Sequence, residues 1–98
     1  ALLDQYMARP NALGYADWGG GLIWLNHPEG HDASAGIIRE MLSKYGGHAT
    51  LYEASEQIRR LVPVFQPQPA ALHGLTRRVK ASFDPLGVLN PGRMYEGV

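Results

Sequence analysis

The sequence contains no cysteine among its 98 residues. Disulfide bonds, thiolate metal sites, cysteine nucleophiles and iron–sulfur clusters held by these residues are therefore excluded. The sequence also lacks an excess of charge of either sign, since nine Lys and Arg balance nine Asp and Glu and the net charge is +0. A nucleic-acid surface usually needs a basic excess, so we expect no nucleic-acid partner.

Long apolar runs are missing as well. The longest aliphatic and aromatic run is GLIWL at 21–25, whereas a membrane-spanning helix needs about 20 apolar residues. The chain begins at Ala1 without a basic segment followed by an apolar one, so we expect neither a signal peptide nor a transmembrane segment. We expect a domain cut from a longer, cytoplasmic protein.

What remains is enough to fold, because hydrophobic residues make up 45% of the chain and charged residues 18%. Apolar spacing and capping residues predict helices over 33–45, 56–62 and 70–83. The first residues predict either a short helix that Arg9-Pro10 stops or the end of an upstream element. Branched and aromatic residues predict β structure over 12–26 and 48–54. The predicted class is α+β: a small antiparallel sheet from these two segments, with helices 33–45 and 70–83 packed on one face.

Local signals mark the ends of these elements. Asp32 is the expected N-cap of the second helix and Ser55 that of the third. The pair Gly46-Gly47 suits a left-handed helix stop. The inner stripe of the last helix is expected to comprise Leu72, Leu75, Val79 and Phe83.

The triple glycine at 19–21 is followed by LIWL, which is typical of a strand. A phosphate loop opens a helix, so we reject that interpretation and expect either a hairpin turn or a bulge. Trp18 and Trp24 lie on the same segment, and we expect them to pack in a core or interface rather than against a ligand.

Two histidines, His27 and His31, are four residues apart, which suits a metal site on a helix. Pro28 and Gly30 lie between them and make a helix unfavourable there. We therefore expect no metal site.

Two prolines, two glycines and one arginine lie close together in the tail, FDPLGVLNPGRMY at 83–95. Asp84-Pro85 is expected to stop the last helix, and Asn90-Pro91-Gly92 predicts a second turn. Arg93 follows with a planar fork of donors. A stiff backbone beside such a fork suits contact with a polar ring edge or a carboxylate, whereas the alternative is a loop that only ends a helix.

The order K-x-x-F-D-P-x-G-V-L-N-P-G-R-M, from Lys80 to Met94, resembles the C-terminal signature of FAD-linked oxidases of the vanillyl-alcohol-oxidase type. Within that family, DWGGGLIWL and GGHATLYEA look like the FAD-binding (E) subunits of bacterial glycolate oxidases. The resemblance covers most of positions 14–95.

This resemblance implies a division of the chain. Residues 1–82 would be the C-terminal part of the cap (substrate) domain, and 83–98 a segment that returns to the flavin. The flavin-binding module would be absent, so the fragment alone is expected to be inactive. Carried over by position, Asn90 and Arg93 would be polar contacts near FAD, and Gly92 would allow close backbone approach. No catalytic residue is assigned.

The resemblance further implies hydride transfer from a small 2-hydroxy acid, such as glycolate, to FAD in the full protein. The implied partners are a companion flavoprotein subunit and an iron–sulfur subunit, through which the protein would be peripheral at the inner membrane. The chain lacks the H-x-G-D-G-N-x-H stretch of related 2-hydroxy-acid dehydrogenases. Whether this subunit oxidises the substrate or relays electrons therefore stays open. The alternative function is a non-catalytic α+β module that binds other subunits through its Trp-bearing sheet.

Overall fold

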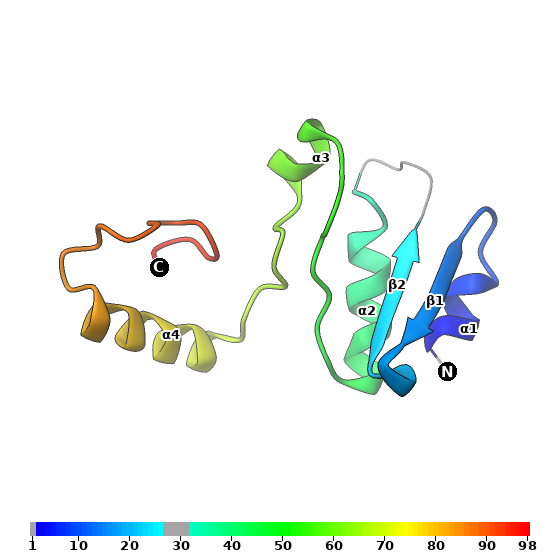
Figure 1. Ribbon diagram of the computed structural model, residues 1–98, viewed down its shortest axis with the longest axis horizontal. Coiled ribbons are helices and arrows are strands. Elements are labelled where there is room, and N and C mark those ends of the chain that lie inside the picture. The colour runs from blue at the N-terminus through cyan, green and yellow to red at the C-terminus, as the bar shows by residue number, and fades with distance from the viewer. Residues whose placement is uncertain (1, 27–31) are drawn as a thin grey trace.

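The computed structural model describes residues 2–26 and 32–98 (Figure 1). Within these residues, the sheet is a two-stranded antiparallel hairpin. Strand β1 (Leu13–Asp17) pairs with β2 (Leu22–Asn26) so that Tyr15 lies opposite Trp24. The short 3₁₀ turn η1 (Trp18–Gly20) joins them, with φ of 63° at Gly19 and 93° at Gly20. Only glycine adopts such angles at little cost, so the triple glycine makes a hairpin turn, one of its two predicted alternatives.

Helix α1 (Leu2–Met7) packs on one face of the hairpin and buries Leu2 and Tyr6. Tyr6 is 1% exposed and is the most completely buried large side chain among the described residues. A methyl group on Gly14 of β1 would lie 3.0 Å from both Leu3 Cδ1 and Leu25 Cδ2. Glycine at this position therefore permits the close approach of helix and strand.

Helix α2 (Ala35–Tyr45) begins two residues later than predicted, and Ser34 rather than Asp32 is its N-cap. Ser34 has a φ of 59° and makes no capping bond with its own side chain. Asp32 nevertheless accepts hydrogen bonds from the backbone N–H of Ser34 at 2.9 Å and of Gly36 at 3.3 Å. Its carboxylate thus satisfies amides at the start of the helix from one turn further out.

Helix α2 ends at Gly46, whose φ of 78° and ψ of 174° lie in a region that only glycine populates readily. Replacing Gly46 with alanine is expected to lower the free energy of unfolding by about 1–3 kcal/mol. Gly74→Ala, the same change inside a helix with open space around it, should raise that energy by about 0.5–1 kcal/mol. Hydrogen exchange of the amides in the two helices measures each change where it occurs, and equal effects of the two changes would contradict the assignment.

The predicted strand at 48–54 is wrong, because this segment forms no ladder with the hairpin. Leu51 N–H donates to the Val64 carbonyl at 2.8 Å and Ala49 N–H to Gln66 Oε1 at 2.9 Å. The residues it meets are flanked by Pro63 and Pro67, which have no N–H to extend a ladder. The segment is therefore extended but not a strand.

Helix α3 (Glu56–Leu61) is capped by Ser55 as predicted, since its Oγ accepts from Ile58 N–H at 3.5 Å. Ile58 and Val62 are buried. Arg39 of α2 donates from Nη2 to the Pro63 carbonyl at 2.6 Å. This bond ties α2 to the chain that leaves α3.

Helix α4 (Ala70–Phe83) has its predicted bounds but stands away from the sheet, with residues 84–98 folded back along it (Figure 1). The prediction that this helix covers the sheet is therefore wrong. Its expected inner stripe is exposed, from 47% at Leu72 to 85% at Phe83. The radius of gyration is 15.6 Å, whereas a compact domain of about 100 residues has about 13 Å. The chain is α+β as predicted, but elongated.

None of the helices in the described part of the chain is long and apolar enough to cross a membrane.

Candidate functional site

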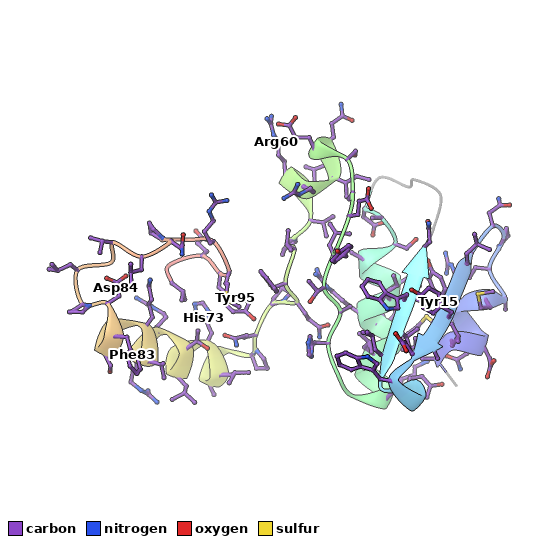
Figure 2. All side chains as sticks on the ribbon, in the orientation of Figure 1. Tyr15, Arg60, His73, Phe83, Asp84 and Tyr95 are labelled. Carbon is purple, nitrogen blue, oxygen red and sulfur yellow. The ribbon has the colours of Figure 1, made fainter. Side chains whose placement is uncertain are left out.

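The candidate site is the C-terminal segment 84–98 together with the face of α4 along which it folds. Figure 2 shows His73 of α4 and Asp84 and Tyr95 of this segment between the helix and the loop. Asp84 is the C-cap, and its N–H donates to the Lys80 carbonyl at 2.8 Å. Because Pro85 follows without an N–H of its own, the helix ends here as predicted.

One carboxylate organises the first turn of the segment. Asp84 is only 7% exposed, and it accepts from Val88 N–H at 3.0 Å and from Leu89 N–H at 2.8 Å. Lys80 Nζ lies 2.8 Å from Asp84 Oδ2 and also donates to the Leu89 carbonyl. Gly87, with a φ of 63°, lets the chain turn around the carboxylate.

The Lys80 hydrogen bond, followed by that from the Leu89 backbone, lowers the pKa of Asp84 to about 2 from its ordinary value of 3.8. A carboxyl whose pKa is depressed by folding stabilises the fold above its ordinary pKa, and that stabilisation is lost as the pH falls toward the folded value. We therefore expect the ¹³C signal of the Asp84 carboxyl to titrate with a midpoint near 2 and the loop to loosen between about pH 4 and 2. In a Lys80→Met variant the midpoint should rise. A midpoint near 3.8 in the unmodified protein would contradict the arrangement.

The second turn presents the residues that the sequence singled out. Asn90 has a φ of 46° and Gly92 one of 71°, and the Arg93 N–H donates to the Asn90 carbonyl at 3.3 Å. Asn and Gly are the residues that best tolerate this left-handed conformation. All three residues are exposed. The space around Gly92 is open within this chain, so its backbone angle rather than crowding requires glycine here.

A hollow of about 430 Å³ lies between α4 and the C-terminal segment. The charged residues that line it are Arg77, Lys80 and Asp84. The other lining residues are small or apolar: Ala81, Pro85, Gly87, Pro91, Gly92, Gly97 and Val98. Of the three predicted site residues, Gly92 lines the hollow together with Lys80 and Asp84. Asn90 and Arg93 are not among its lining residues.

Tyr95 anchors the far end of the segment. Its ring lies 6.1 Å from that of His73 in α4, edge-on, and 6.1 Å from that of Phe65 in the connector before α4. A second tie is the hydrogen bond from Gly92 N–H to the Val98 carbonyl at 2.7 Å. The segment is thus held at both ends against α4.

Sequence reasoning missed the part that Lys80 and Asp84 play in this loop, since it treated Asp84 only as a helix stop. The signal is an Asp at a helix C-cap followed by Pro and Gly, with a Lys one turn earlier. Such an arrangement lets a short side chain accept backbone amides a few residues ahead.

The remaining residues that the sequence singled out are two histidines and two tryptophans. His27 and His31 lie outside the described residues. Among the residues that are described, no three His, Cys, Asp or Glu side chains gather as a metal site would require. Trp18 is exposed on the hairpin turn, and Trp24 packs edge-on against Tyr52 with ring centroids 5.3 Å apart.

The chain is similar to a curated protein, glycolate oxidase subunit GlcE of Escherichia coli (strain K12). The two are 38% identical over 79 residues, which is 81% of this chain but 20% of that relative's length. No protein-family model matches the chain, and no solved structure matches it significantly. The predicted resemblance to a glycolate oxidase subunit is confirmed, and the chain spans about one fifth of the relative that it matches.

Proposed function

On the basis of this relationship, we propose that the chain is part of a flavoprotein subunit of a glycolate (2-hydroxy-acid) oxidase. The 38% identity to GlcE is the observation that carries the proposal. Residues 1–82 are then the C-terminal part of the cap domain, and 83–98 return to the flavin. FAD, when bound to the full-length protein, supplies the acceptor for hydride from the α-carbon of the substrate.

The turn at 90–93 has the chemistry that a flavin edge needs. The exposed Asn90 amide offers both donor and acceptor, and the exposed Arg93 guanidinium offers a rigid fork of donors. A cation beside the ring stabilises negative charge that develops when hydride arrives, and it also suits a substrate carboxylate. We therefore assign Asn90 and Arg93 as flavin-proximal contacts and Gly92 as the residue whose backbone angle shapes the turn between them.

The exposed apolar surface of α4 and the tail supports membership of a larger protein. The exposed residues are Leu72, Leu75, Val79, Phe83, Leu86, Val88, Leu89 and Met94. So large an apolar area normally packs against something. Since GlcE is about five times as long as the matched segment, the remainder of the polypeptide is the partner we propose. The isolated fragment would then be inactive, because the flavin-binding module is elsewhere.

The relative is described as a subunit, which supports the proposal that this protein also assembles with other subunits. None of the 98 residues is a cysteine that could hold an iron–sulfur cluster. A companion subunit with such a cluster would take the electrons, and a companion flavoprotein subunit would share the chemistry. Attachment to the inner membrane would be through the complex.

A second candidate function has an observation of its own. Register pairing places Leu13, Tyr15 and Trp24 on the face of the hairpin opposite α1, and Leu13 and Tyr15 are 64% and 60% exposed. Tyr52 extends this aromatic face. Such a face suits a non-catalytic module that binds a companion subunit.

A visible absorption spectrum of the full-length protein distinguishes these functions. The protein is purified with and without its companion subunits, and spectra are recorded before and after addition of glycolate. We expect flavin bands in the protein alone. Bleaching by glycolate without companions means a catalytic subunit, and bleaching only with companions means a relay. No flavin in either preparation would contradict the proposal and favour the interaction module.

A further inference from the structure

The geometry points to Lys80 and Asp84 as positioning residues: together they hold the turn that presents Asn90 and Arg93 in one orientation. This inference rests on the proposed function, because it takes that turn as the flavin contact. Neither residue is proposed to touch the flavin.

This pair binds both backbone polar groups of Leu89, the N–H and the carbonyl. Its N–H donates to Asp84 Oδ2 at 2.8 Å, and its carbonyl accepts from Lys80 Nζ. The Leu89 carbonyl lies in the same peptide plane as the N–H of Asn90. Fixing that oxygen therefore fixes the orientation in which the backbone enters Asn90.

The orientation passes on to Arg93 through the turn. Arg93 N–H donates to the Asn90 carbonyl at 3.3 Å, so the position of one residue constrains the other. Both Lys80 and Asp84 stand at the end of the 14-residue helix α4, which is a stiffer base than a loop. The pair thus connects a helix to the proposed contact residues.

Exposure separates this pair from an ordinary surface ion pair. The side chain of Asp84 is 4% exposed and that of Lys80 24%. Glu56 and Arg60 in α3 form a pair with the same spacing, but their side chains are 78% and 76% exposed. Exposed pairs contribute little because water and salt compete with them. The pair in α3 is therefore a matched control.

The test uses the full-length protein with its flavin and two independent measurements. Hydrogen exchange of the peptide 84–93 reports the turn, and the flavin absorption band with its reduction rate reports the contact. Lys80→Met keeps the Asp84 acceptors but removes the cation, and Asp84→Asn keeps the size but weakens the acceptors. We expect each to raise exchange of the peptide and to slow flavin reduction by roughly tenfold, as for loss of one charge-assisted hydrogen bond.

In Lys80→Arg, which keeps the cation, exchange of the peptide and the rate of flavin reduction should stay close to those of the unmodified protein. Arg60→Met should change neither quantity. Unchanged exchange in Lys80→Met would overturn the inference at its first step. Raised exchange with a normal flavin, when Asn90→Ala plus Arg93→Ala does alter the flavin, would overturn positioning and leave the proposed function intact. A normal flavin in that double variant would instead overturn the site assignment, and this inference with it.

Discussion

Replacing Asn90 and Arg93 together by alanine in the full-length protein is expected to slow flavin reduction by glycolate by roughly 10- to 100-fold. Loss of a hydrogen bond to a charged group costs about 1.5–3 kcal/mol, which corresponds to this range. Both side chains are exposed on the turn and contribute nothing to the core of this chain. The expected loss is therefore one of rate and spectrum rather than of folding. Stopped-flow absorption of the flavin measures it, and gel filtration checks that the complex still assembles.

Asn11→Ala plus Arg78→Ala is a matched control for this double variant. Asn11 also has a positive φ, of 57°, and Arg78 is an exposed cation on α4. The control thus removes one asparagine and one arginine side chain, as the test variant does. It imposes similar backbone strain, but away from the turn. It should leave flavin reduction unchanged. Equal slowing in both variants would mean that strain or net charge, not flavin contact, explains the effect.

Replacing Tyr6 by alanine is expected to destabilise the α1–hairpin unit by about 3–5 kcal/mol, the usual cost of removing a large aromatic side chain from a core. Tyr6 is 1% exposed, and burial raises the pKa of its hydroxyl above the ordinary value. Among the described residues, Tyr6 is the most completely buried large side chain, so its removal takes away the largest single part of this small core. Hydrogen exchange of the β1 and β2 amides in the full-length protein measures the loss.

Tyr45→Ala is the control for this cavity, because Tyr45 is half exposed at the end of α2. It should cost no more than about 1 kcal/mol. Tyr6→Phe keeps the ring and should retain most of the stability. If Tyr6→Ala and Tyr45→Ala lowered protection of the hairpin equally, α1 would not be a packed part of this unit.

The elements of this protein that could be predicted are those with local causes. The bounds of α4 follow from its apolar spacing and from Asp84-Pro85, and the Ser55 cap was correctly placed for α3. The hairpin follows from three glycines between two runs of strand-forming residues. The resemblance to a glycolate oxidase subunit could likewise be inferred from two short segments and the tail, and the similarity to GlcE confirms it.

The predictions that failed required knowledge of distant partners. The segment 48–54 has the composition of a strand, but it meets residues 64–66 between two prolines instead of a strand edge. Helix α4 has an apolar stripe, and such a stripe predicts a packing partner without identifying it. In this chain the sheet does not cover it (Figure 1).

For the candidate site, the residues of the turn could be recognised from their types alone, because Asn90 and Gly92 suit left-handed backbone and Arg93 carries the donors. The folded chain was needed to show that Asp84 accepts hydrogen bonds from two amides ahead of it and that Lys80 donates to the Leu89 carbonyl. A sequence pattern records the backbone preference of each residue separately. Hydrogen bonds between a helix end and a loop depend on how the chain folds back, which no single residue encodes.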